Sequence, residues 1–237
     1  MTSDSLDSHE RDLRRVLDRL RASGVKLNLK KTRLFRDRAS FLGHVLVPVG
    51  VIPQREKIRN IKKWTTPTNK KELKSFLRFA PLYRKFIPNF ATMKSSFYKL
   101  LKKGVPWVWD QAMTPRFEEC KQLFREDAVL VNPDLRRPFI VYVDSSGHGL
   151  GAVLVQRNDS GEESVVTFAS RSLTTCERNY STTELECLAI IFAFSKFRPF
   201  LLGQGPTVRT DHLSLSFLKK NKVSEPKTDT VLAGIRV

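Results

Sequence analysis

The sequence has few of the features that mark a membrane protein, a secreted disulfide protein or a zinc-binding module. Its 237 residues include only 3 cysteines, Cys120, Cys176 and Cys187, which lie far apart without paired metal-ligand spacing. This argues against a disulfide framework and a zinc knuckle. The sequence contains no apolar run long enough to span a bilayer, and it opens without a signal-peptide pattern. We therefore expect an intracellular protein, cytoplasmic or nuclear, with no membrane partner.

Acidic residues are scarce relative to basic ones, and the imbalance lies in the first half of the chain. The net charge is +18, and residues 1–130 carry 29 basic and 13 acidic side chains. Residues 55–103 alone carry 15 basic and 2 acidic side chains, interleaved with aromatic residues. This pattern predicts a polyanionic partner such as nucleic acid. An anionic membrane surface is the competing interpretation, but the aromatic spacing is typical of a helical core.

Hydrophobic periodicity in residues 1–130 predicts mainly helices. Two short strands are expected at Val25–Leu29 and Ala39–Val47, the second followed by a turn at Pro48-Val49-Gly50. Asn69 and Glu72 form a capping-box pattern at the start of one of the expected helices. The expected helices are His9–Ala22, Gln54–Trp64, Asn69–Phe79, Ala91–Leu101 and Pro115–Ala128. From residue 51 to about 105 this predicts a small, basic, helical module.

The second half alternates strands with helices. Strands are expected at 139–144, 151–156 and 165–169, joined by short turns into an antiparallel meander. A helix at Thr182–Phe197, a strand at 207–210 and a helix near His212 follow. This order predicts an α/β layer domain.

Three acids stand at key points of this predicted domain. Asp144 and Asp211 each end a strand, and Glu186 lies on the helix between them. Such a set suggests a metal-binding carboxylate cluster. Taken singly, an acid at a strand end more often caps a turn. Glu184 competes with Glu186 for the helical position, and the residues alone leave this choice open.

Six short motifs follow one another at characteristic spacing. They are Phe41-Leu42-Gly43-His44, Tyr83-Arg84-Lys85-Phe86-Ile87-Pro88-Asn89-Phe90, Asp144-Ser145-Ser146, Gly149-Leu150-Gly151-Ala152-Val153-Leu154, Asn179-Tyr180-Ser181-Thr182-Thr183-Glu184-Leu185-Glu186 and Thr210-Asp211-His212. Together they resemble the reverse transcriptase and ribonuclease H (RNase H) region of long-terminal-repeat retroelement Pol polyproteins, most like the gypsy type. Each motif alone is weak evidence, but their order makes the resemblance specific.

The resemblance implies a fold of the α/β (α+β) class, with an RNase H-like mixed sheet, flanking helices, and a helical thumb and palm remnant before them. Residues 1–50 would be the end of the polymerase palm, 51–105 the thumb, 106–135 a connection and 136–237 the RNase H domain. Phe41, Leu42, Gly43 and His44 would form the hairpin that grips the primer end. Arg84 and Lys85 would also contact nucleic acid.

The resemblance also implies a chemistry and its partners. Asp144, Glu186 and Asp211 would hold two Mg²⁺ ions, which activate the water that hydrolyses the RNA strand of an RNA:DNA hybrid. The resemblance favours Glu186 over Glu184, because the family pattern has a glutamate followed three residues later by a small residue, here Ala189. The partners would be this hybrid and a template-primer duplex, and we leave open a homo-oligomer or a second Pol-derived subunit.

The sequence departs from the family pattern at both ends. In the family, the paired polymerase aspartates stand just before the serine that aligns with Ser3, and a fourth RNase H carboxylate lies beyond the position of Val237. We therefore expect a fragment truncated at both ends, without polymerase activity and with an incomplete two-ion site. The alternative function is a non-catalytic nucleic-acid-binding remnant or a relic reading frame.

Overall fold

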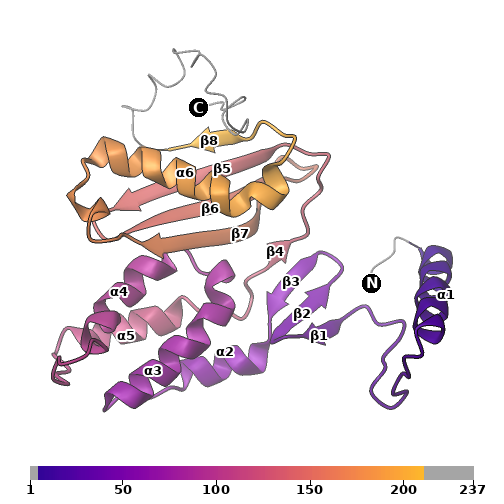
Figure 1. The fold of residues 1–237 in the computed structure, drawn as a ribbon, viewed down its shortest axis with the longest axis horizontal. Helices are drawn as coiled ribbons and strands as arrows, with labels where there is room; N and C mark the ends of the chain where they lie inside the picture. The colour runs from indigo at the N-terminus through magenta and orange to yellow at the C-terminus, as the bar shows by residue number, and fades with distance from the viewer. Residues whose placement is uncertain (1–4, 211–237) are drawn as a thin grey trace. The chain divides into compact units, whose positions relative to one another are not determined.

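The computed structural model describes residues 5–210, and it divides into two compact units, Met1–Asp37 and Arg38–Val237 (Figure 1). The predicted helix after the strand at residue 207, together with Asp211 and His212, lies outside the described residues. The fold of each unit is described separately below. Nowhere in residues 5–210 is there a helix with the length and apolar character needed to cross a membrane.

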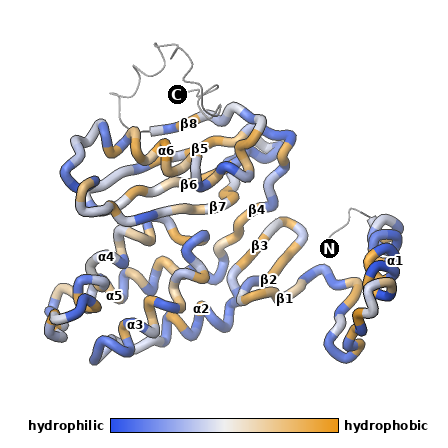
Figure 2. Tube along the Cα trace, viewed as in Figure 1, coloured by the Kyte–Doolittle hydropathy of each residue, from blue (hydrophilic) through white to orange (hydrophobic). Residues whose placement is uncertain are grey.

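The first unit contains helix α1, Leu6–Ala22. Ser5 caps it, because its hydroxyl accepts from the Ser8 backbone while the Ser8 side chain binds the Ser5 backbone. The helix therefore begins three residues before the predicted start at His9, and it ends as predicted before Gly24, which has φ +69°. Figure 2 shows α1 mostly in hydrophilic colours. The strand predicted at Val25–Leu29 is wrong, because no neighbouring strand in the described part supplies its hydrogen bonds.

The second unit opens with a small antiparallel sheet. Strands β1 (Ala39–Phe41), β2 (His44–Val47), β3 (Gly50–Pro53) and β4 (Leu130–Val131) lie in that order. The single strand predicted at Ala39–Val47 is in fact a hairpin. Leu42 and Gly43 have φ of 48° and 80°, which closes a tight two-residue turn between β1 and β2. Periodicity missed this turn because Leu42 is apolar like its strand neighbours.

The helical module has the four predicted helices and a 3-10 helix that periodicity did not predict, and its last helix ends at Gln122 rather than at the predicted Ala128. It contains α2 (Arg55–Lys62), α3 (Lys70–Phe79), the 3-10 helix η1 (Ala80–Phe86), α4 (Phe90–Leu100) and α5 (Met113–Gln122). The Asn69 side chain accepts from the Glu72 backbone at 3.0 Å, which confirms the predicted cap of α3. Phe76 and Phe97 are buried and pack on Phe117 of α5, with ring centroids 4.7 and 6.1 Å apart. These aromatic rings are therefore core residues, and α5 shares the core of the module before it.

The third part is a mixed sheet that carries the predicted meander. Strands β5 (Phe139–Ser146), β6 (Gly149–Arg157) and β7 (Glu163–Ser172) pair antiparallel, and β8 (Thr207–Arg209) pairs parallel to β5. The sheet order is β7-β6-β5-β8. The short 3-10 helix η2 (Glu177–Asn179) leads into α6, Thr182–Leu201, which crosses the sheet (Figure 1). This architecture confirms the predicted α/β class.

The two faces of this sheet have different partners. Val141 and Val143 of β5 share a buried core with Ala189 and Ala193 of α6. The alternate residues of the strands face the helical module instead. One of them is Ser170 of β7, whose hydroxyl accepts a hydrogen bond from the Ala91 backbone N–H at 3.0 Å. Because neighbouring residues of a strand point to opposite faces, α6 and the start of α4 cover opposite sides of the sheet.

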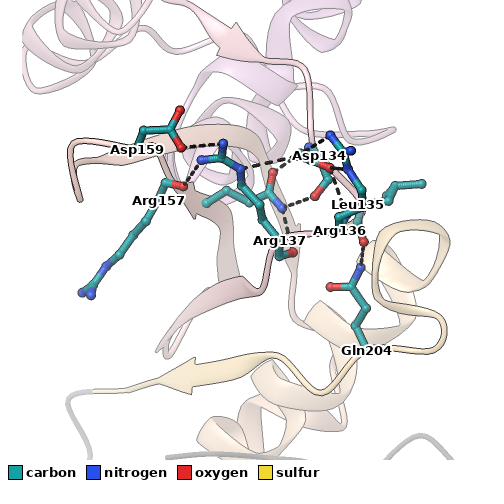
Figure 3. Close-up of polar contacts among 8 residues, drawn as sticks. Asp134, Leu135, Arg136, Arg137, Arg157, Asp159 and Gln204 are labelled. Atoms are coloured by element: carbon teal, nitrogen blue, oxygen red, sulfur yellow. Dashed lines mark hydrogen bonds and ion pairs between the residues drawn. The ribbon is translucent and has the colours of Figure 1, made fainter.

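A polar cluster fastens the segment between β4 and β5 to the mixed sheet (Figure 3). The Gln156 side chain is 4% exposed, and it bonds the backbone N–H and C=O of Asp134 and the carbonyl of Arg137. Arg137 also pairs with Asp159 at 2.7 Å. A buried amide with its hydrogen bonds satisfied fixes the start of β5 relative to β6.

Candidate functional site

Glu186 occupies the position where α6 passes over the end of β5. Its side chain is buried, at 3% exposure. The Ser145 hydroxyl donates to one carboxylate oxygen at 2.5 Å, and the Thr210 hydroxyl donates to the other at 3.3 Å. Ser145 follows Asp144 directly and Thr210 precedes Asp211 directly. The helix therefore places Glu186 against the neighbours of both other predicted acids.

Asp144 lies on the opposite face of β5 from Ser145 and is exposed. The Asn89 amide, at the start of α4, donates to one of its oxygens at 3.0 Å. Asn89 adopts the left-handed conformation, with φ 46°, and its side chain makes no capping bond to α4. Its amide instead lies over Gly151, the cross-strand neighbour of Asp144, where a Cβ would stand 2.0 Å from the Asn89 oxygen. The helical module thus contacts the Asp144 carboxylate directly.

This contact also revises the interpretation of the glycines in β6. Two glycines as close in sequence as Gly149 and Gly151 are typical of a tight strand connection. The connection is instead made by Gly147 and His148, whereas Gly149 and Gly151 lie inside β6. A Cβ on Gly149 would meet the Thr92 hydroxyl at 2.8 Å. The same Cβ would also stand 2.8 Å from the Arg171 carbonyl oxygen of β7. Gly151 therefore lacks a side chain because the start of α4 approaches the sheet closely, and Gly149 because both α4 and the β7 backbone do.

Glu184 has a different role from Glu186. Its carboxylate accepts from the Ser181 backbone and hydroxyl, both at 2.8 Å, and completes a capping box at the start of α6. These bonds, the backbone one first, lower the pKa of Glu184. The carboxylate is thus occupied by the helix terminus, which favours Glu186 for the metal-binding role.

The donor set is suited to a hard cation, since Mg²⁺ prefers carboxylate oxygens. Within residues 5–210 no hydrogen bond joins Asp144 to Glu186, and that stretch contains no cluster of three His, Cys, Asp or Glu side chains able to hold a metal. The third predicted acid, Asp211, lies just outside the described residues. The carboxylates of Asp144 and Glu186 are thus ligands of the type that Mg²⁺ prefers, and the structure describes these two of the three predicted ligands.

A cleft of about 590 Å³ opens beside Asp144 and Asn89. Arg209 of β8 lines it, and its guanidinium donates to the Tyr142 hydroxyl at 2.7 Å and pairs with Glu163 at 3.2 Å. The Tyr142 hydroxyl in turn donates to Glu163 at 2.6 Å, which raises the pKa of Tyr142 and lowers that of Glu163. The sequence did not single out Asn89, Ser145 or Arg209, although the first two lie inside quoted motifs.

The hairpin predicted to grip a primer end is built as a projecting turn. Phe41 and Leu42 are 61% and 76% exposed. Neighbouring exposed apolar residues of this kind are typical of a surface that binds a partner. The Tyr83 hydroxyl of η1 donates to the Gly43 carbonyl at 2.9 Å and holds the turn against the helical module. His44 stacks on Phe86 with ring centroids 5.7 Å apart.

Arg84 and Lys85 lie on η1, next to this hairpin. Arg84 is exposed, whereas Lys85 is half-buried and its pKa is lowered by that burial. The structure thus brings together His44, Arg84 and Lys85, which line one cavity, and it places Asp144 and Glu186 separately, near the end of β5.

The cysteines have no role in either place. Cys120 is buried in the helical core, and burial raises its pKa to about 12, which makes the thiol unreactive. Cys176 and Cys187 are separate free thiols.

Comparison with known proteins identifies the region to which the chain is similar. The family model of the RNase H-like domain found in reverse transcriptase matches residues 109–208. The Retrovirus-related Pol polyprotein from transposon 297 of Drosophila melanogaster is 36% identical over 222 residues, covering 93% of this chain and 20% of that protein. The Pol polyprotein from transposon gypsy of the same organism is 30% identical over 238 residues, covering 95% and 22%. The chain spans about a fifth of the length of these curated relatives.

Solved structures agree on the fold. The foamy viral protease-reverse transcriptase in complex with RNA/DNA hybrid superposes with a TM-score of 0.75 at 25% identity, covering 97% of this chain and 31% of that chain. The same viral protein in complex with dsDNA gives a TM-score of 0.75 at 25% identity, covering 96% and 48%. The resemblance inferred from the motifs and the predicted fold class are both confirmed.

Proposed function

We propose that residues 136–237 form an RNase H-type centre for RNA:DNA hybrids. The proposal is supported by the RNase H-like family model, which matches residues 109–208, and by the Pol polyproteins that are similar to nearly the whole chain. In this proposal residues 1–50 are the end of a polymerase palm, 51–105 a thumb and 106–135 a connection. The thumb and the hairpin at Phe41 to His44 bind the duplex, and residues 136–237 hydrolyse its RNA strand.

The observation that carries the proposal is the environment of Glu186. A carboxylate buried to 3% exposure needs hydrogen-bond partners, a counter-charge or a metal to offset its burial. Within residues 5–210 no basic side chain forms an ion pair with Glu186, and only the hydroxyls of Ser145 and Thr210 contact it. These hydroxyls lie next in sequence to Asp144 and Asp211, so the strand ends that carry both acids meet at Glu186. This proximity of the two strand ends supports a shared metal site, although the Asp144 side chain itself lies on the opposite face of β5 and binds the Asn89 amide.

The side chains have distinct proposed roles. Asp144, Glu186 and Asp211 supply the carboxylate oxygens that hold divalent ions, which when bound activate water and stabilise charge on the phosphate. Ser145 and Thr210 keep the Glu186 carboxylate at the end of the sheet. Two features support nucleic acid as the partner: residues 55–103 carry 15 basic side chains against 2 acidic ones, and foamy viral reverse transcriptase was solved with an RNA/DNA hybrid.

A second candidate function is duplex binding without hydrolysis. The specific observation in its favour is the Asn89 amide, which takes up one oxygen of Asp144 at 3.0 Å. An oxygen engaged in that bond is less available to a cation. Both functions predict duplex binding that weakens steeply as salt rises.

One assay separates the two functions. The full chain is incubated with a labelled RNA:DNA hybrid and Mg²⁺, beside Asp144→Asn, which keeps the shape and removes the charge. RNA cleavage that the variant lacks supports the nuclease, and binding without cleavage by the wild-type chain supports the second function. A chain that neither binds nor cleaves the hybrid contradicts both.

A further inference from the structure

A second cavity lies away from the carboxylates, where four elements of the larger unit meet. Its volume is about 340 Å³. His44 comes from β2, Arg84 and Lys85 from η1, Phe168 from β7, and Lys196 and Phe197 from α6. Three of these side chains are cations, and no acidic residue lines the cavity. Most of the residues that line the cavity are apolar. Arg84 and Lys196 are exposed to water, whereas Lys85 is half-buried.

The cations of this cavity have no compensating acid. Within residues 5–210 none of Arg84, Lys85 and Lys196 forms an ion pair. The Lys85 amine is partly buried, stands 5.4 Å from the centre of the Phe86 ring, and has its pKa lowered by desolvation. A partly desolvated ammonium without a counter-charge is unfavourable, and an anion in the cavity supplies that counter-charge.

His44 adds a polar atom that lacks a partner. Its Nδ1 lies 3.0 Å from the Leu42 carbonyl oxygen, which can only accept, so Nδ1 carries the hydrogen. The other ring nitrogen, Nε2, is buried and makes no hydrogen bond of normal geometry to the described residues, although the Leu82 carbonyl is close enough to act on the ring. Buried polar atoms without a well-formed hydrogen bond are rare in folded proteins, so this nitrogen is a candidate to bind a group in the cavity.

We propose that this cavity is a phosphate-binding site in which Lys196 of α6 joins His44, Arg84 and Lys85 around one phosphate group. The site rests on, and deepens, the duplex binding proposed for the thumb and the hairpin, to which it adds Lys196 of α6. It is independent of the proposed cleavage chemistry, because it needs no carboxylate and no metal. It connects the primer-side hairpin and the helical module to the RNase H-like sheet through one shared anion. The phosphate belongs either to the backbone of a bound duplex or to a free phosphate compound.

Phosphate binding in this cavity takes up a proton at His44. Burial and then the charge of Lys85 lower the pKa of His44, partly offset by the carbonyls of Leu42 and Leu82, so the ring is neutral near pH 7 in the empty cavity. An anion at Nε2 favours the protonated ring, which donates from both nitrogens. The other ionisable groups of the cavity are Arg84 and Lys85 on η1 and Lys196 on α6, and β7 contributes none. Binding therefore strengthens as the pH falls.

The test compares Lys196→Gln with Arg198→Gln in the full chain. Arg198 is an exposed cation two residues further along the same helix, and it does not line the cavity. The first probe is an RNA:DNA hybrid, with affinity measured by fluorescence anisotropy over a range of salt concentrations in EDTA. The second probe is inorganic phosphate, with the thermal midpoint measured against chloride at equal ionic strength.

A site on the duplex backbone predicts that Lys196→Gln lowers the slope of log affinity against log salt by about 0.9, and that Arg198→Gln leaves the slope unchanged. A site for free phosphate predicts that phosphate raises the midpoint of the wild-type chain but not of Lys196→Gln, with equal duplex slopes. Either result supports the site. Equal behaviour of both variants with both probes overturns it. Because neither probe reads cleavage, an inactive nuclease leaves this test intact.

Discussion

The Asn89 amide donates a hydrogen bond of 3.0 Å to the Asp144 carboxylate, joining two residues that are 55 positions apart. Asn89 belongs to the helical module and Asp144 to the mixed sheet. The Asn89 backbone is in the left-handed conformation, and its side-chain amide points to Asp144. As a result, the Asn89 side chain does not cap the start of α4. The packing of the helical module on the sheet and the hydrogen bonding of the Asp144 carboxylate are therefore physically linked.

Replacing Asn89 by Asp tests the linkage with almost no change in shape. Asn89→Asp exchanges the hydrogen bond for two carboxylates at contact distance, which should lower stability by about 1 kcal/mol, or about 3 °C in Tm. A divalent cation between the two carboxylates offsets that repulsion. We expect Mg²⁺ to raise the Tm of Asn89→Asp more than that of the wild-type chain. Equal Mg²⁺ responses would show that Asn89 and Asp144 do not interact in solution.

Gly151 provides a second route to the same contact. A Cβ on Gly151 meets the Asn89 oxygen at 2.0 Å, whereas a Cβ on Gly147 meets nothing within 4 Å. Gly151→Ala should therefore displace the Asn89 side chain and destabilise the chain by about 1 to 3 kcal/mol, while Gly147→Ala should stay within about 0.5 kcal/mol of the wild type. Chemical denaturation of both variants measures the difference. Similar losses in the two variants would contradict the close approach of α4.

Glu184 and Glu186 are separated by their partners. Glu186→Gln should abolish RNA cleavage while the fold is retained, because it removes a charge that the proposed metal site requires. Glu184→Gln should lower Tm slightly through the weaker capping box and leave cleavage unchanged. The measurement is hybrid cleavage together with thermal unfolding for both variants. If Glu184→Gln lost cleavage and Glu186→Gln kept it, the metal ligand would be Glu184 and not Glu186.

The lowered pKa of Glu177 predicts that the protein loses stability at acid pH. Its side-chain bonds with Arg171 at 2.7 and 2.9 Å, followed by a bond from the Thr174 backbone, lower the pKa of Glu177 to about 2. Because the folded pKa lies below the unfolded value, the stabilisation is complete above an unfolded pKa of about 4.3 and is lost as the pH falls toward 2. Glu177→Gln should therefore lower Tm near neutral pH and match the wild type near pH 2. An offset in Tm that does not change with pH would refute this assignment.

The sequence by itself determined most of the local structure. Asn69 and Glu72 predicted the cap of α3, and the alternation after Phe139 predicted the meander, because capping and period-two patterns depend on neighbours in the chain. The same local logic failed at Val25–Leu29, where an alternating pattern has no partner strand. It also failed at Leu42, where an apolar residue takes the turn conformation.

Tertiary structure decided what the local patterns leave open. Glu184 and Glu186 are two positions apart on one helix, and only packing buries one carboxylate against Ser145 and commits the other to a helix cap. Asn89 reaches Asp144, and Lys196 reaches the cavity of His44, across distances in sequence that no periodicity spans. The acids and cations were visible in the sequence, because residue type sets their chemistry. Their partners were not, because those depend on which surfaces the folded chain brings into contact.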